Sequence, residues 1–234
     1  VLFRSPAGQQ FCRKVLMHFS PHRKLCAESI SSFEQVRRQI REWSDAGAKP
    51  LVVGIGGPGG CGKSTLCRWL AERMPDVSVL SLDDFRLPRA ERPPHAPYAS
   101  HPDALRKETL LKALQEFRCG RTVIQPVFDP VSGKICGEHP LPAASLLLVD
   151  GECVAYEFVR QAVDRLILVE AHWRTQLNTR LSRDLRERNC SLEKALQVFL
   201  QSNLQDYPKF AAGVETAADL RLYRNSRGRF LLQG

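Results

Sequence analysis

The stretch that decides the fold is Gly57-Pro58-Gly59-Gly60-Cys61-Gly62-Lys63-Ser64. It fits the pattern G-x-x-x-x-G-K-[ST] without a gap. An apolar run at 51–55, rich in β-branched residues, enters it as a predicted strand, and a helical pattern from about 63 to 73 leaves it. Glycines let backbone N–H groups point at one anion, and the helix N-terminus adds its dipole. The sequence therefore predicts a loop that cradles the phosphates of a nucleotide, which we take to be ATP.

Each residue type in this loop suits that task. Lys63 is expected to contact the β- and γ-phosphates, and the hydroxyl of Ser64 to ligate Mg²⁺. Cys61 stands where a helix N-terminus lowers the pKa of a thiol, so we expect it to be sensitive to oxidation. A glycine turn that binds nothing is the alternative, and the flanking strand and helix disfavour it. The residues expected to bind ATP are Gly57, Gly59, Gly60, Cys61, Gly62, Lys63, Ser64 and Thr65.

Outward from the loop, strand and helix patterns alternate. Strands are predicted at 77–82, 122–127, 145–149, 165–169, 220–223 and 229–232, and helices at 103–118, 154–162, 173–188 and 191–204. The proline-rich stretch 86–102 is predicted to be a loop, and 129–133 a turn. The alternation indicates an α/β fold: a doubly wound parallel sheet of the P-loop NTPase type, with three α/β/α layers.

The N-terminal part of the chain looks helical. Residues 11–43 read as two helices, the second with an apolar face at three- and four-residue steps. We expect residues 1–50 to form an N-terminal helical extension and residues 51–234 to form the P-loop domain. Residues 1–5 lack an initiator Met and resemble translated adapter DNA, so they are a candidate artefact and receive no structural role.

Two carboxylates follow buried strands. Asp83 and Asp150 come at the ends of the strands predicted at 77–82 and 145–149. In an open parallel sheet ligands bind at the carboxyl ends of the strands, so both are expected near the phosphate loop. We expect Asp150 to hold Mg²⁺ with Ser64, and Asp83 to touch the metal, orient a substrate hydroxyl and accept its proton. A helix cap or loop carboxylate is the alternative for each.

Five arginines fall in the helical stretch 174–188. Arg180 and Arg183 share a helix face, and we expect them to belong to a lid that closes over ATP and neutralises charge on the transferring phosphoryl group. The alternative is a solvated helix in which Asp184 and Glu187 pair with the arginines.

Composition narrows the classes of function. The net charge is +9, but the basic residues are dispersed and no aromatic-basic RNA motif occurs, which disfavours a nucleic-acid partner. No apolar run approaches the roughly 20 residues of a membrane helix, so no membrane partner is expected. The eight cysteines show no C-x-x-C spacing and no secretory signal is visible, so we expect reduced thiols and a cytoplasmic protein. The composition is compatible with a homo-oligomer and does not decide the oligomeric state.

Taken in order, the motifs resemble the uridine kinase and phosphoribulokinase group of P-loop kinases over residues 51–222. The resemblance implies a doubly wound α/β fold, an ATP–Mg²⁺ donor, a hydroxyl acceptor, Asp83 as the base and an arginine lid. The matching segments are 57–64, Ser81-Leu82-Asp83-Asp84-Phe85, His101-Pro102-Asp103-Ala104-Leu105, Gln125-Pro126-Val127-Phe128-Asp129, Val149-Asp150-Gly151, 180–188 and Ala218-Asp219-Leu220.

The chain departs from this family at several positions. Where the family has an Asp, a Tyr and a Glu, this chain has Ser100, Phe128 and Asp150. Where the family has further residues that bind the nucleoside, this chain has Pro130, Gly133 and Cys190. Lost hydrogen-bonding groups leave a ribose or pyrimidine poorly satisfied. The departures therefore bear on the acceptor more than on the reaction.

The sequence predicts a kinase that moves the γ-phosphate of ATP to a hydroxyl of a small metabolite. A nucleoside of the uridine or cytidine type is the first acceptor expected; pantothenate, glycerate, a sugar or a sugar phosphate is the alternative. The residues expected to line the acceptor site are Asp84, Arg86, His101 and Phe128. A nucleotide-dependent switch or assembly NTPase is a second hypothesis, although no N-K-x-D base-recognition motif is present, and a nucleic-acid-binding module is a third that rests only on charge.

Overall fold

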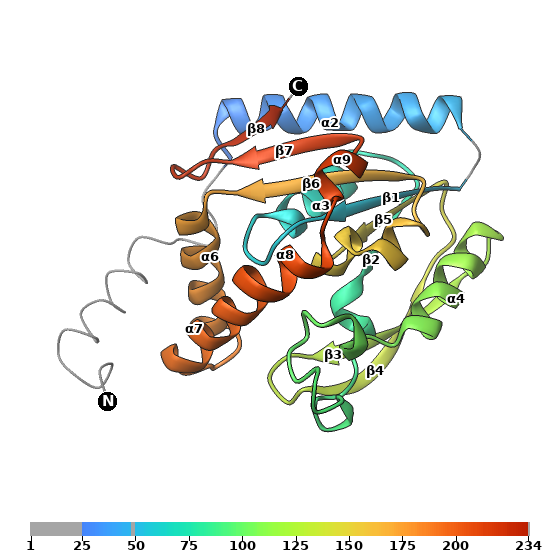
Figure 1. Cartoon of the computed structure of the whole chain (residues 1–234). Helices are drawn as coiled ribbons and strands as arrows, with labels where there is room; N and C mark the ends of the chain where they lie inside the picture. Colours follow the sequence, from blue (N-terminus) through green and yellow to red (C-terminus); the bar gives the residue numbers. More distant parts are fainter. Residues whose placement is uncertain (1–24, 48–49, 234) are drawn as a thin grey trace.

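A computed structural model describes residues 25–47 and 50–233, and its centre is a six-stranded sheet (Figure 1). The spatial order of the strands is β2-β5-β1-β6-β7-β8, and every neighbouring pair is parallel except β7 and β8. The first of the two helices expected within 11–43 lies mostly outside the described residues. The strands are β1 (Leu51–Gly56), β2 (Val77–Ser81), β5 (Leu146–Asp150), β6 (Arg165–Ala171), β7 (Leu220–Arg224) and β8 (Phe230–Gln233).

Helices cover both faces of the sheet. Along β1, Val52 packs into one buried cluster and Val53 into the other, because successive side chains of a strand point to opposite faces. The helices α2 (Ala27–Ala46) and α3 (Lys63–Ala71) cover the Val53 face. The other face receives α4 (Lys107–Arg118), α5 (Glu157–Arg160), α8 (Tyr207–Phe210), α9 (Val214–Ala217) and the 3₁₀ turn η5 (Glu152–Ala155). The predicted doubly wound three-layer α/β fold is confirmed.

The helix α2 is part of this core. Its Phe33 is fully buried, with its ring centroid 5.5 Å from that of Trp69 and 4.8 Å from that of Phe230. The Ser32 hydroxyl donates to the Phe230 carbonyl (3.1 Å) and accepts from the Leu232 N–H (3.3 Å), which fastens α2 to β8. The division of the chain at residue 50 stays a prediction.

A separate antiparallel hairpin lies beside the sheet, made of β3 (Val123–Asp129) and β4 (Lys134–Leu141). Sequence patterns predicted β3 and the turn after it but not β4. The reason is that β4 is exposed along almost its whole length and contains Gly137 and Pro140, so no apolar alternation marks it. Short 3₁₀ turns connect the hairpin region to the sheet: η2 (Leu82–Phe85), η3 (Arg89–Glu91) and η4 (Pro102–Ala104).

The C-terminal helices differ from the expected ones in their limits. The arginine-bearing helix is α6 (Trp173–Arg186), and α7 (Leu192–Gln201) packs against it. The helix expected at 191–204 continues from α7 as a π-helical turn, η6 (Ser202–Asp206), and then as α8. The helix expected at 103–118 begins at Lys107, after η4. None of the helices in 25–47 and 50–233 combines the length and the apolar character that a bilayer span requires.

Candidate active site

The pocket lies at the carboxyl ends of three adjacent strands. Ile55 of β1, Asp150 of β5 and Ser81 of β2 stand level in the sheet register, so the segments that follow them meet at one edge. This is where the glycine loop, the Asp83 turn and α6 converge. The residues lining the pocket are Gly59, Gly60, Lys63, Ser64, Ser81, Asp83, Arg86, Asp150, Gly151, Glu152, Arg180 and Arg183.

The glycine loop joins β1 to α3 as predicted. Gly57 has φ +143°, and a Cβ there would lie 1.9 Å from the carbonyl oxygen of Val169, so only glycine fits. Gly62 has φ +111° and directly precedes α3. The loop therefore leads directly into the start of a helix, and its residues that line the pocket are Gly59, Gly60, Lys63 and Ser64.

The ammonium group of Lys63 lies inside the curve of this loop. It donates to the carbonyls of Gly57 (2.9 Å) and Pro58 (3.0 Å), and the side chain is almost completely buried. Burial alone would lower the pKa of Lys63, but the acidic groups around it, among them Asp150, raise it overall. Lys63 is therefore positively charged at neutral pH, with its ammonium group held against the loop.

Asp150 has the features of a metal-binding carboxylate. Its Oδ1 is buried and makes no hydrogen bond within the described part of the chain. Burial raises the pKa of Asp150, while Lys63 and a hydrogen bond from Ser64 act in the opposite direction. A buried oxygen without a partner is costly unless a ligand satisfies it. An oxygen pair from Asp150 and Ser64 is also the donor set that Mg²⁺ prefers, so the residues present fit this ion.

Asp83 lies two residues beyond β2, in η2, among cations. Arg86 donates to its Oδ1 at 2.7 Å, and Arg188 lies 3.9 Å from its Oδ2. Desolvation would raise the pKa of Asp83, but Arg86, Arg188 and further cations hold it at about 2. The carboxylate is therefore ionised at neutral pH and half-exposed to the pocket.

Arg180 and Arg183 both line the pocket, and a buried carboxylate organises them. Asp184 lies 3.7 Å from Nε of Arg180 and 3.6 Å from Nε of Arg183, and it also holds Arg188 at 3.2 Å. Arg180 is buried, and that burial lowers its pKa, whereas Arg183 stays partly exposed. Asp184, which the solvated-helix alternative named as a partner, does pair with the arginines, but in a buried cluster rather than on a solvated helix. Closure of α6 over ATP stays a prediction.

Glu152 is a pocket residue that sequence reasoning missed. It is buried, its Oε2 lies 3.8 Å from Nη1 of Arg180, and Ser202 donates to its Oε1 at 3.4 Å. Burial raises the pKa of Glu152, and Arg180 and Lys63 counteract this. Its only sequence signal was its place directly after the Asp150-Gly151 pair.

Of the four expected acceptor residues, the structure brings only Arg86 into this pocket. Asp84 instead accepts hydrogen bonds from Gln125 (2.8 Å) and from the Phe128 N–H (3.1 Å), which anchors the hairpin. His101 caps η4 and its ring packs against Phe210. Phe128 is buried in the hairpin. A role for Asp84, His101 and Phe128 in binding the acceptor therefore stays a prediction.

Two loop residues differ in character. Cys61 is fully buried, and burial raises the pKa of its thiol despite the opposing charge of Lys63. The expected lowering of that pKa was wrong, because desolvation outweighs the charge of Lys63 and the hydrogen bond from the Lys63 backbone. Thr65 is exposed in the first turn of α3, where its N–H donates to the Gly62 carbonyl (3.1 Å).

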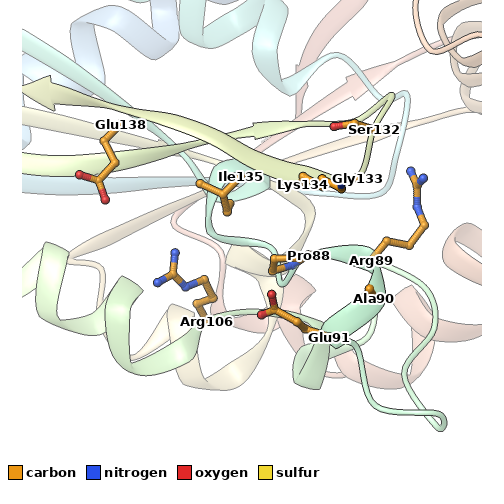
Figure 2. A pocket seen from close by; sticks show the side chains of 10 residues that line it. All are labelled: Pro88, Arg89, Ala90, Glu91, Arg106, Ser132, Gly133, Lys134, Ile135 and Glu138. Atoms are coloured by element: carbon orange, nitrogen blue, oxygen red, sulfur yellow. The ribbon is translucent and has the colours of Figure 1, made fainter.

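A second hollow, of about 870 Å³, lies between the η3 segment and the hairpin (Figure 2). Its charged side chains are of both signs, with Arg89, Arg106 and Lys134 beside Glu91 and Glu138. The expected site residues are absent from its lining, which consists of Pro88, Arg89, Ala90, Glu91, Arg106, Ser132, Gly133, Lys134, Ile135 and Glu138.

The chain is similar to known proteins in sequence and in fold. A model of the Phosphoribulokinase / Uridine kinase family matches residues 52–228. A uridine kinase from Leuconostoc citreum is 25% identical over 183 residues, which cover 74% of this chain and 87% of that protein. Uridine-cytidine kinase 2-B from Danio rerio is 27% identical over 196 residues, with coverage of 76% and 74%. The solved D-glycerate 3-kinase from Cryptococcus neoformans has a TM-score of 0.68 at 14% identity, covering 89% of this chain and 100% of that one, and shows the likeness of fold alone.

Proposed function

Because the chain belongs to the phosphoribulokinase and uridine kinase family and is a P-loop kinase, we propose that it transfers the γ-phosphate of ATP to a hydroxyl group of a small metabolite. One observation carries the proposal: the ionised carboxylate of Asp83 faces the same pocket as the ammonium of Lys63 and the glycine loop. A phosphate-binding loop needs no such carboxylate, whereas phosphoryl transfer to an alcohol does.

The residues take distinct parts in this reaction. The loop amides and Lys63 bind the polyphosphate, and Asp83 orients the acceptor hydroxyl. With a pKa of about 2, Asp83 is a weak base, so it takes the proton late, as the hydroxyl oxygen bonds to phosphorus. Arg180 and Arg183 stabilise the negative charge of the transferring group. Ser64 and Asp150 would hold Mg²⁺, which when bound neutralises charge on the β- and γ-phosphates.

The test is a screen of metabolites with ATP, read by the mass of the phosphorylated product. The Asp83→Asn variant should lose transfer at least 100-fold while it binds ADP as the wild type does, because the amide keeps the shape and loses the charge. Asp45→Asn, which changes an exposed carboxylate at the end of α2, is the matched control. Full transfer activity in Asp83→Asn would defeat the assignment of the base.

For the acceptor, we propose a nucleoside of the uridine or cytidine type first. The sequence relatives named uridine kinase and uridine-cytidine kinase support it. A second class, an alcohol that carries its own carboxylate or phosphate, is favoured by a specific observation. Arg92 donates only to the carbonyls of Leu87 and Pro97, and it pairs with no carboxylate in residues 25–47 and 50–233.

The surroundings of Gly133 favour the same second class. A Cβ at Gly133 would lie 2.7 Å from the guanidinium carbon of Arg89. At Gly133, where the family has a residue that binds the nucleoside, the cation of Arg89 therefore fills the space of a side chain. Burial first, and then the nearby cations Arg86 and Arg89, lower the pKa of Arg92 to about 10. An anionic acceptor would relieve that repulsion.

Ionic strength separates the two acceptor classes. The KM of an anionic acceptor should rise several-fold between low and about 0.5 M salt, because screening weakens its attraction to the arginines. The KM of a neutral nucleoside should change little over the same range. Phosphorylation of nucleosides with no dependence of KM on salt would exclude the anionic class, and turnover of glycerate or a sugar phosphate alone would exclude the nucleoside.

A further inference from the structure

A single amide side chain connects the π-helical turn η6 to the phosphate loop. Asn203 is almost completely buried, and its Nδ2 donates to the carbonyl of Gly59 (2.8 Å) and to Oε1 of Gln176 (2.8 Å). Its Oδ1 accepts from Nη1 of Arg180 at 2.6 Å. Both amide hydrogens and the amide oxygen of Asn203 are thus engaged, and one of the three partners is the glycine loop itself.

The hydrogen bond to the Gly59 carbonyl also sets the orientation of the whole Gly59–Gly60 peptide group. In a planar trans peptide the C=O of one residue and the N–H of the next point in opposite directions. Because Asn203 holds the Gly59 oxygen, the N–H of Gly60 is directed away from Asn203. Gly60 lines the pocket and Asn203 does not, so the pocket is the side on which this N–H would meet a phosphate.

Without Asn203, little would keep this peptide in place. Both of its residues are glycines, which rotate between peptide orientations at low steric cost. A flipped peptide would present the Gly59 carbonyl oxygen to the phosphates in place of an N–H, which exchanges a donor for a repelling dipole. The π-helical turn brings Asn203 to this point, and such turns are frequent at functional sites.

We propose that Asn203 is a positioning residue that holds the Gly59–Gly60 peptide in the orientation that binds phosphate. The inference rests on the proposed function, since it requires that the loop bind a nucleotide. It assigns to η6 a task that the glycine-loop pattern does not contain, because the amide comes from a segment more than 140 positions further along the chain.

The test is equilibrium binding of ADP, measured by calorimetry on the full chain, which needs no acceptor. Asn203→Ala should weaken ADP binding about 10- to 100-fold. This is the range expected when the hydrogen bond from the Gly60 N–H to a charged phosphate is lost. Asn203→Asp should weaken it at least as much, because a carboxylate cannot donate to the Gly59 carbonyl. Gln205→Ala, an exposed amide in the same turn, should bind ADP as the wild type does.

The aspartate variant separates this proposal from a role through Arg180 alone. Asn203→Asp keeps an acceptor for Arg180, so ADP affinity near that of the wild type in this variant would overturn the proposal. The KM for ATP should rise in both variants while the KM for the acceptor stays unchanged, a split that general loosening of the fold would not produce. If Asn203→Ala does not fold, the nearly isosteric Asn203→Asp decides alone. A wild type that binds no ADP would overturn the proposed function, and this inference with it.

Discussion

Gly59→Ala offers a sharp test of the role of Arg180. A Cβ at residue 59 would lie 2.0 Å from Nη1 of Arg180 and 3.1 Å from Oδ1 of Asn203. The backbone of Gly59 is outside the left-handed region, so alanine fits the main chain without strain. The part that gives way is therefore the guanidinium group, the far end of a long side chain, which must retreat by about 1 Å to reach a tolerable contact.

That retreat moves a guanidinium group that the structure holds in place. Nη1 of Arg180 is 2.6 Å from Oδ1 of Asn203. Because Nη1 lies 2.0 Å and Oδ1 3.1 Å from the new Cβ, a retreat away from the Cβ runs nearly perpendicular to this hydrogen bond and lengthens it only slightly. Misplacement of a contact to the reacting group by about 1 Å can cost about 100-fold, so kcat/KM should fall about 10- to 100-fold if the held position of Arg180 serves the transition state. The melting temperature should stay within a few degrees of the wild type, because the buried core is unchanged.

The assay is kcat/KM for ATP with the acceptor found in the mass screen, beside a thermal melt. Gly137→Ala is the matched control, because a Cβ there meets nothing within 4 Å. Wild-type kcat/KM in Gly59→Ala would refute a catalytic role for the held position of Arg180. A large loss of stability with retained activity per folded molecule would refute the claim that only the side chain yields.

Three further outcomes are expected. Arg86→Gln removes the nearest cation from Asp83, so the pKa of that carboxyl should rise from about 2. The acid limb of the pH profile of kcat/KM should then move up by about one pH unit, because activity is lost as the pH falls through the raised pKa. Phe33→Ala should lower the free energy of unfolding by about 3–5 kcal/mol in a denaturant titration, because the side chain is fully buried. Brief alkylation of the native protein should leave Cys61 unmodified while the exposed Cys119 reacts, as read by peptide mass.

Each of these has a control and a contrary result. For the acid limb, Arg37→Gln changes an arginine on α2 and should not shift the profile; an identical shift there would remove Asp83 from the explanation. For stability, Ile30→Ala alters an exposed position of the same helix and should cost less than about 1 kcal/mol. For the thiols, early modification of Cys61 would show that the loop opens to solvent far more often than its burial indicates.

The fold was predictable because its strands are buried and its glycine loop is local. Residues 51–55 and 146–149 are continuous apolar runs, and the eight residues from Gly57 carry a contiguous motif that is recognisable without knowledge of distant segments. The strand β4 escaped prediction because a mostly exposed strand leaves no apolar pattern. Periodicity reports burial, so elements that bury little remain invisible to it.

The site was predictable only in its local parts. Lys63, Ser64, Asp83 and Asp150 follow from strand ends and a contiguous motif, and all four line the pocket. Asn203 could not be found, because its value depends on a π-helical turn that no pattern of side chains announces and on a contact with a glycine far away in the chain. The pKa of Cys61 was misjudged for a related reason: burial is a tertiary property, and here it outweighs the local effect of Lys63.

The bonds between α2 and β8 bear on how the molecule comes to be assembled. The ring of Phe230 closes over Phe33 on one side, and on the other it reaches the start of α3, where a Cβ at Gly62 would lie 2.5 Å from it. During synthesis β8 leaves the ribosome after all the other described strands. In a nascent chain that lacks β8, the apolar face of α2 is partly uncovered and the glycine loop lacks its contact with Phe230. Both contacts form together once Phe230 packs into place.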